Sequence, residues 1–360
     1  MWGAVRAPST FPTQDSVETI AKAGLDLHFE RSQTYEVTMK PTRRQHIVSS
    51  RLLSNFTDDS EVLWVYTKDR HVRPSKPERE CWERDFFEFE LHGRKTNNRY
   101  ENWLAQIEGE AWPILQLLIE RRRLSDRQAR SWAEFVASLF GRTRKVRAQI
   151  SEAMVNRLRG QTDDPEFLRE LQYWLLQRGE LHYAEDLRKK VADFRTAREI
   201  IPSFYHVWAL PNRVRVLLEP LLEKTWITIE APASKSFLIS DCPVMTVELQ
   251  EGRFLSGAGF GKKNTVILLP LASKYLFVAA PSDFGWKQGT AEPRAVDMVN
   301  RLIIQSAHRN VYANVESDDI RTLVDNEIDS IVFGKNAFLP SGPAPSHSAQ
   351  EERCLKETST

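Results

Sequence analysis

The sequence predicts an α+β protein with a short N-terminal β/turn segment, a central helical bundle, and a C-terminal mixed β region with flanking helices. Apolar residues recur with helical spacing over about residues 99–223, and short β-rich runs fill about residues 224–339. Of the 360 residues, 41% are hydrophobic and 28% are charged, which excludes a disordered chain, a fibre and a membrane protein. We expect one domain over residues 41–339, between a weakly ordered extension (1–40) and a disordered tail (340–360).

The N-terminal segment of this domain carries one helix-like and two strand-like patterns. An apolar stripe from Gln45 to Phe56 indicates a short helix or turn. The β-branched and aromatic run Val62–Tyr66 lies between polar turn residues, so it predicts a strand. The run Phe86–Leu91 indicates a further extended segment.

The central region predicts five or six helices. In the first, we expect a kink at Pro113. The second begins with the capping-box pattern Ser125-x-x-Gln128 and ends at Gly141. Further helices are predicted to end at Gly160, to run from Asp164 to Gly179, and to run from Leu181 to Ile200.

The C-terminal region predicts short strands and two helices. The strands are Trp226–Ile229, Phe237–Ile239, Val244–Val247, Thr265–Leu269 and Tyr275–Val278, and the helices are Arg294–His308 and a capped helix from Asp318 or Asp319. Between two of these strands, the glycine-rich stretch Ser256–Lys263 lacks the first glycine and the final hydroxyl residue of a phosphate-binding loop. A hairpin loop between Phe254 and Thr265 is the better interpretation.

Three cysteines (Cys81, Cys242 and Cys354) lie far apart, which makes a disulfide framework or a structural zinc site improbable. The first sixteen residues lack the apolar core of a secretory signal. The longest apolar stretch, Val266–Ala280, is too short and too interrupted to span a membrane. We therefore expect a cytoplasmic protein that does not bind a membrane.

The net charge of +1 conceals an uneven distribution of charge. Residues 120–160 contain 11 cations and 4 anions, so this segment carries 11 − 4 = +7. Arginines clustered on helices suit phosphate recognition, so the region Arg121–Arg147 is a candidate site for nucleic acid or another polyanion. The alternative, which we favour, is a solvated helical face whose arginines pair with acidic residues elsewhere, since the rest of the chain sums to −6.

Four polar residues are candidates for catalysis: His46, Glu108, Asp241 and Asn300. His46 could bind a metal or act as a general base, but a histidine beside an apolar stripe is also typical of a structural residue. Asp241 follows an apolar strand, where side chains project into clefts. Ser240 and Asp241 could equally brace the turn through backbone hydrogen bonds.

Helical spacing relates some of these residues to further polar groups. Glu101 and Glu108 are seven residues apart, so they share a helix face and could offer two carboxylates to a metal. Ordinary surface glutamates show the same spacing. Asn300 and His308 are eight residues apart and roughly aligned on one predicted helix, and Arg309 follows directly.

Several of these residues belong to an ordered set of short motifs. The set is Gln45-His46-x-Val48, Asn55-Phe56, Trp64-Val65-Tyr66, Phe86-Phe87-Glu88, Trp103-Leu104-x-x-Ile107-Glu108, Ser240-Asp241-x-Pro243-Val244, Leu269-Pro270-Leu271, and Asn300 with Ala307-x-Arg309-x-Val311-Tyr312. In order and spacing it resembles the bacterial and fungal family called domain of unknown function 4238, over about residues 40–334. The family usually has proline where this chain has Ser49, and commonly asparagine where it has Cys242. The resemblance implies the span of the fold and points to His46 and Asp241, but it implies no reaction.

We expect the four candidate catalytic residues to line a polar cleft between the N-terminal segment and the C-terminal β region. Gln45 and Arg309 would contact the substrate there. Histidine and carboxylates can hold a divalent metal, so the reaction that fits best is metal-assisted hydrolysis of a phosphodiester or similar bond.

The alternative function is that of a non-enzymatic interaction module, whose helical bundle binds a protein partner. Exposure of Trp132 or Trp174 on the bundle would favour this alternative.

Overall fold

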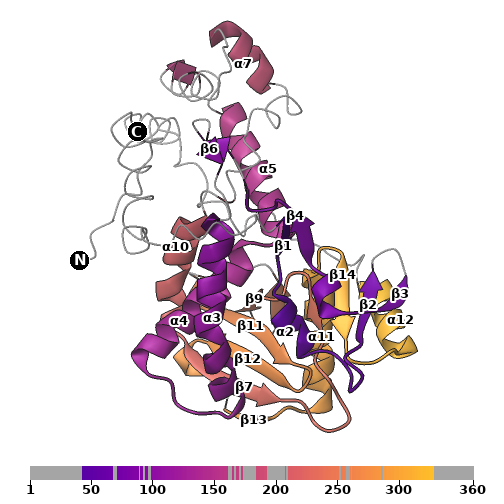
Figure 1. Ribbon diagram of the computed structural model, residues 1–360. Coiled ribbons are helices and arrows are strands. Elements are labelled where there is room, and N and C mark those ends of the chain that lie inside the picture. The colour runs from indigo at the N-terminus through magenta and orange to yellow at the C-terminus, as the bar shows by residue number, and fades with distance from the viewer. Residues whose placement is uncertain are drawn as a thin grey trace, which may run out of the picture.

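The computed structural model describes residues 43–327, with gaps at 68–70, 89, 92–93, 96–98, 251–252, 257–259, 261 and 285–286, and with only part of the stretch 161–209. It confirms the predicted α+β class (Figure 1). The predicted helix from Asp164 to Gly179 lies largely outside the described residues. The predicted extension (1–40) and tail (340–360) lie wholly outside them.

The largest sheet has six strands in the order β10-β9-β11-β12-β7-β13. Its neighbours pair antiparallel, except for the parallel pair of β13 and β7. The strands are β7 (Thr225–Glu230), β9 (Met245–Gln250), β10 (Arg253–Ser256), β11 (Thr265–Ala272), β12 (Tyr275–Ala280) and β13 (Gly289–Thr290). Four of these were predicted as strands, to within a few residues.

This strand order corrects one prediction. The segment between Phe254 and Thr265 is not a hairpin loop, because β10 and β11 both pair with β9, on its opposite sides. The hairpin partner of β10 is β9, and the glycine-rich segment connects strands that are not neighbours.

The central strands are buried on both faces of the sheet. In β11, Val266 and Leu268 belong to one core cluster, whereas Ile267, Leu269 and Leu271 belong to another. Because successive side chains of a strand point to opposite faces, a strand covered on both sides needs an unbroken apolar run rather than alternation. The sequence of β11 contains such an unbroken apolar run.

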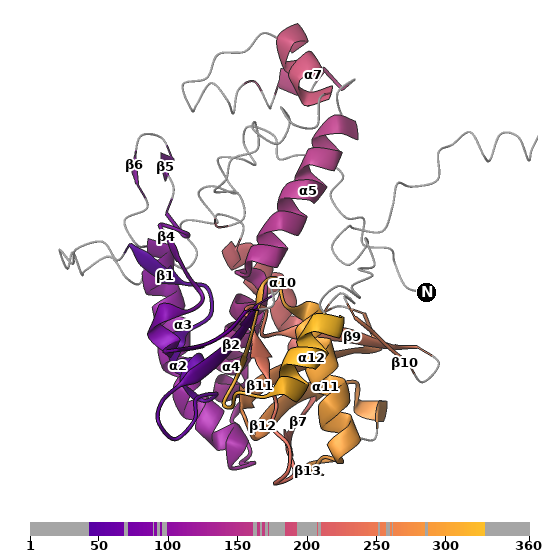
Figure 2. The same cartoon turned by 90° about the vertical axis from the view of Figure 1, so that its right-hand side faces the viewer.

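Three helices cover one face of the sheet: α3 (Arg99–Ile119), α4 (Asp126–Gly141) and α10 (Leu210–Leu222). Figure 2 shows them on the opposite side of the sheet from α11 (Pro293–Ser306) and α12 (Asp318–Glu327). The α4 helix begins with the predicted capping box, in which Ser125 and Gln128 bond reciprocally. The α3 helix continues through Pro113 to Ile119.

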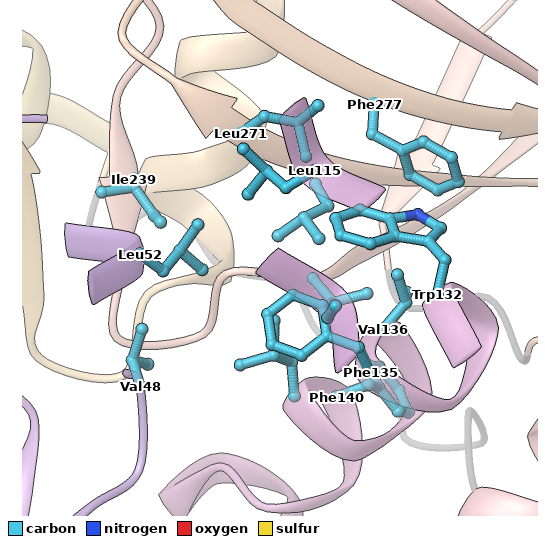
Figure 3. Close-up of a cluster of buried hydrophobic side chains, with 14 of the residues drawn as sticks. Val48, Leu52, Leu115, Trp132, Phe135, Val136, Phe140, Ile239, Leu271 and Phe277 are labelled. Atoms are coloured by element: carbon cyan, nitrogen blue, oxygen red, sulfur yellow. The ribbon is translucent and has the colours of Figure 1, made fainter. Parts of the chain in front are cut away.

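Trp132 lies at the centre of the core between these helices and the sheet. Its ring lies 5.3 Å from that of Phe135 and 5.6 Å from that of Phe277 on β12, measured between centroids. Figure 3 shows this contact beside Val136 and Leu115. Trp132 is fully buried, so the exposure that would have favoured a protein-binding bundle does not occur there. Trp174 lies outside the described residues.

A second sheet joins distant parts of the chain in the order β3-β2-β14-β8. Its strands are β2 (Leu63–Thr67), β3 (Val72–Ser75), β8 (Ile239–Ser240) and β14 (Asn310–Ala313). Two-stranded pairs join β1 (Arg44–His46) to β4 (Trp82–Arg84) and β5 (Glu90–Leu91) to β6 (Arg94–Lys95). The predicted helix or turn at Gln45 thus begins as a strand, and the short helix α2 (Ser50–Ser54) follows it.

The remaining elements are two 3-10 turns, η2 (Pro77–Arg79) and η3 (Ser282–Phe284), and the helices α5 (Arg144–Gly160) and α7 (Ala184–Ala192). The α5 helix extends away from the sheets, with α7 near its far end (Figures 1 and 2). Among the described helices, none combines the length and apolar character needed to cross a membrane.

Replacing Trp132 with alanine tests the packing of the helices on the sheet. We expect Trp132→Ala to lower the free energy of unfolding by about 3–5 kcal/mol, because it leaves a cavity against Phe277. Urea unfolding would measure the change. Val216→Ala is the control, since Val216 is 72% exposed and its loss should change stability by less than about 0.5 kcal/mol. Equal stability of the two variants would contradict this packing.

Candidate functional site

His46 ends strand β1, where it lies opposite Trp82 of β4. Its Nε2 atom is buried and has no hydrogen-bond partner. Burial lowers the pKa of His46, and a hydrogen bond with the backbone of Glu78 and the charge of Glu108 oppose this shift only in part. The ring is therefore neutral at pH 7, with one nitrogen available to accept a proton.

Arg142 follows α4 directly and is buried, and its charge contributes to the lowered pKa of His46. Its side chain is 1% exposed, and its Nη2 donates to Oε1 of Glu108 on α3. The Nε atom of Arg142 is buried and has no hydrogen-bond partner. A buried guanidinium is costly unless a carboxylate compensates it, so Glu108 holds this charge in place while one N–H remains unused.

Glu101 lies two helical turns before Glu108 on the same helix, and its environment favours the protonated form. Burial raises the pKa of Glu101 to about 7. Arg142 opposes this shift, whereas Glu108 and Glu88 add to it. Near neutral pH this carboxyl group is therefore half protonated and can donate a proton.

These four side chains, which we call the His46–Arg142 cluster, are His46, Glu101, Glu108 and Arg142. They come from β1, α3 and the end of α4. The cluster contains a neutral imidazole, a carboxylic acid that titrates near neutrality and a buried cation with an unused donor. Titratable groups whose environments push their pKa values apart are a common arrangement for acid–base chemistry.

Gln45 precedes His46 and is fully buried. Its Oε1 accepts from the backbone N–H of Phe87 at 2.6 Å, and its Nε2 donates to Glu88 at 3.4 Å. Gln45 therefore joins β1 to the segment that carries Glu88, one of the carboxylates that act on Glu101.

Asp241 belongs to a different group of contacts. Its carboxylate accepts from the backbone N–H groups of His308, Arg309 and Asn310 at 2.8, 2.8 and 3.2 Å. Burial raises the pKa of Asp241, and these three hydrogen bonds oppose the shift. The arrangement ties the end of β8 to the start of β14, as in the turn-bracing interpretation of this residue.

Asn300 also bonds to the backbone. From α11 it accepts from the N–H of Leu238 at 3.0 Å and donates to the carbonyl of Ser236 at 2.9 Å. It thereby joins α11 to the segment that leads into β8.

The structure thus distributes the six candidate residues over two groups. The charge of Glu108 acts on His46, with Gln45 adjacent in β1, whereas the carboxylate of Asp241 bonds to the backbone of Arg309. Asn300 lies at the entry to β8. Their assignment to catalysis and substrate binding stays a prediction.

The sequence did not single out Arg142, although it lies directly after the predicted helix end at Gly141. It also did not identify the buried contact of the Cys81 thiol with the Tyr312 hydroxyl, at 2.9 Å. Cys81 and Tyr312 both lie near Asp241. Burial raises the pKa of each, and the negative charge of Asp241 raises it further. Burial also raises the pKa of Cys242 to about 12, so neither described thiol is a nucleophile near neutral pH.

Within the part of the chain that the structure describes, no three or more histidine, cysteine, aspartate or glutamate side chains are grouped so that they could hold a metal ion. The predicted metal ligand His46 instead lies among groups of both charges, Arg142 and Glu108.

Many arginines of the basic segment pair with acidic residues elsewhere. These ion pairs are Arg121–Glu230, Arg130–Glu219, Arg144–Glu83 and Arg147–Glu83. Such pairing is what the solvated-face interpretation of this segment expects. It leaves the binding of a polyanion by this region a prediction.

Asparagine at position 241 tests the backbone anchor. We expect Asp241→Asn to lower the free energy of unfolding by about 1.5–3 kcal/mol, because the amide offers one acceptor oxygen and no charge to the three N–H groups. Chemical denaturation measures this change, with Asp59→Asn, at an exposed turn position, as the matched control. An unchanged midpoint for Asp241→Asn would contradict the anchoring role.

Glu101 should make stability depend on pH. Its pKa is raised in the folded state, so between about pH 4.5 and 7 the folded protein holds more protons than the unfolded chain. The contribution of Glu101 to the free energy of unfolding therefore falls as pH rises through this window. In Glu101→Gln this fall should be absent, and in the control Glu110→Gln, an exposed residue of α3, it should remain. Urea unfolding across the window measures it, and identical pH dependence in Glu101→Gln and wild type would contradict the shift.

A family model described as protein of unknown function (DUF4238) matches residues 44–317, which run from β1 to the start of α12 and include both groups of polar residues. No curated protein and no solved structure matches the chain. Because the match covers most of the chain, the protein belongs to the DUF4238 family.

Proposed function

We propose that the protein is a hydrolase that cleaves a phosphoester, the class that includes the phosphodiesters expected from the sequence, at the His46–Arg142 cluster. The observation that carries this proposal is the pair of buried nitrogens without partners, Nε2 of His46 and Nε of Arg142. Leaving buried polar atoms unpaired costs free energy. Nε1 of Trp132 in the core is such an atom as well, so it is the grouping of two of them with titratable carboxyl groups that points to a substrate as the missing partner.

Each side chain has a distinct role in the proposed reaction. His46, which is neutral at pH 7, accepts a proton from the attacking water. Protonated Glu101 gives its proton to the leaving oxygen, and the N–H of Arg142 donates to a phosphoryl oxygen. Water thus adds to phosphorus as the P–O bond breaks, and transfer of a proton from His46 to Glu101 restores both groups. Glu108 acts by holding Arg142.

This assignment replaces the metal ion of the sequence-based hypothesis with side chains of the protein. The sequence-predicted residues outside the cluster have supporting roles in the proposal. Gln45 positions the segment next to His46, while Asp241 and Asn300 hold β8 and β14 in place. Contact of Arg309 with an anion, binding of a polyanion by Arg121–Arg147 and a cytoplasmic location all stay predictions.

The interaction module remains the alternative function. It has no specific support from Trp132, which is buried in the core.

Hydrolysis of p-nitrophenyl phosphate and bis(p-nitrophenyl) phosphate tests the proposal. We expect His46→Ala to lower kcat at least about 100-fold, the usual contribution of a general base, with wild-type stability as a check on folding. His71→Ala, at an exposed histidine, should retain the activity of the wild type. If the wild-type protein hydrolyses neither compound, the proposal is overturned.

The pH profile distinguishes this mechanism from one that uses a metal. Activity needs neutral His46, whose pKa lies below 6.5, and protonated Glu101, whose pKa is about 7. The profile of kcat/KM should therefore be bell-shaped and fall above about pH 7, and Glu101→Gln should remove this upper limb. The activity should persist in EDTA. A strict requirement for Mg²⁺ or Mn²⁺ would overturn the assignment to side chains while leaving the hydrolase in place.

A further inference from the structure

The His46–Arg142 cluster has limited access, and this restricts what it can bind. The side chain of Arg142 is 1% exposed, and the nitrogens of Arg142 and His46 that have no partners are both buried. Glu101, His46 and Glu108 are only partly exposed. An anion that reaches Arg142 must therefore enter with a compact end group first, because a phosphate flanked by bulky groups on two sides cannot approach a buried donor.

Among the described residues, ion pairs with carboxylates interrupt the row of cations that a nucleic-acid backbone would follow. In the basic segment, Arg121, Arg122 and Arg123 precede α4, Arg127 and Arg130 lie on its first turns, and the remaining arginines follow Gly141. This 16-residue helix is about 24 Å long. At both ends an arginine pairs with a carboxylate, as in Arg121–Glu230 and Arg144–Glu83.

Carboxylates close to the cluster also disfavour a second phosphate. Glu108 and Glu88 both act on Glu101. Like charges near a binding site suppress wrong ligands. A substrate with one phosphate at its end avoids most of this repulsion, whereas a chain of phosphates does not.

We infer that the His46–Arg142 cluster binds the terminal phosphate of a small phosphate monoester, rather than an internal phosphate of a nucleic acid. This inference rests on the proposed function and narrows its substrate class. One phosphoryl oxygen accepts from Nε of Arg142, and the water that attacks phosphorus donates to Nε2 of His46. The P–O bond to the alcohol breaks, the alcohol oxygen takes the proton of Glu101, and the products are inorganic phosphate and the alcohol.

Binding and turnover together test this inference. Inorganic phosphate is the probe for binding by isothermal titration calorimetry. Wild type should bind it, Arg142→Lys should weaken binding at least about tenfold, and Arg215→Ala, at an exposed arginine on α10, should leave binding unchanged. If Arg142→Lys fails to fold, Glu101→Gln provides the second variant. It removes the proton donor and should lower kcat for phenyl phosphate, whose poor leaving group needs that proton, much more than it weakens phosphate binding.

Turnover of three substrates separates the inference from the proposed function. We expect kcat/KM for p-nitrophenyl phosphate to exceed that for bis(p-nitrophenyl) phosphate at least about tenfold, and a single-stranded oligonucleotide to stay intact. Faster cleavage of the diester or the oligonucleotide, lost in His46→Ala, would overturn the inference and leave the hydrolase in place. Phosphate binding that depends on Arg142, without hydrolysis of any substrate, would support the terminal-phosphate site and overturn the hydrolase. Absence of phosphate binding would overturn the inference.

Discussion

The ion pair between Arg142 and Glu108 is the interaction on which the site depends. A guanidinium with a side chain only 1% exposed is tolerated when a carboxylate compensates its charge. Because Glu108 lies on α3 and Arg142 directly follows α4, the pair fixes these helices relative to each other. The preceding residue, Gly141, allows close packing, since a Cβ atom there would lie 2.9 Å from Leu210 of α10. The packing of α3, α4 and α10 therefore also determines where the buried guanidinium of Arg142 lies.

Much of the fold could be predicted because its elements carry local signals. The capping box at Ser125 and the helix stop at Gly141 bound α4, and the apolar runs in β11 and β12 mark strands covered on both faces. The order of strands could not be predicted in the same way. The pairing of β9 with both β10 and β11 depends on which apolar faces meet in space, and no local residue pattern reports that.

The site could also be predicted only in part, because residue type and helical spacing are local signals whereas burial is not. His46 was identified as a residue type suited to acid–base chemistry, and helical spacing placed Glu101 and Glu108 on one face. Arg142 was one of eleven cations in the basic segment, and only burial distinguishes it from the others. For Asp241 the sequence left two roles open, and the choice depends on backbone N–H groups of residues 308–310, which lie 67 to 69 positions later in the chain.

The position of β14 has a consequence for how the chain folds. This strand, residues 310–313, lies between β2 and β8, so it is an inner strand of its sheet although it comes near the end of the described residues. Its partner β2 precedes it by more than two hundred residues. During synthesis from the N-terminus, β2 and β3 leave the ribosome long before the strand that completes their sheet, and such non-local pairing is slow. Until β14 emerges, the exposed edge of β2 is open to other strands, so this family member is expected to depend on protection from aggregation while it is being made.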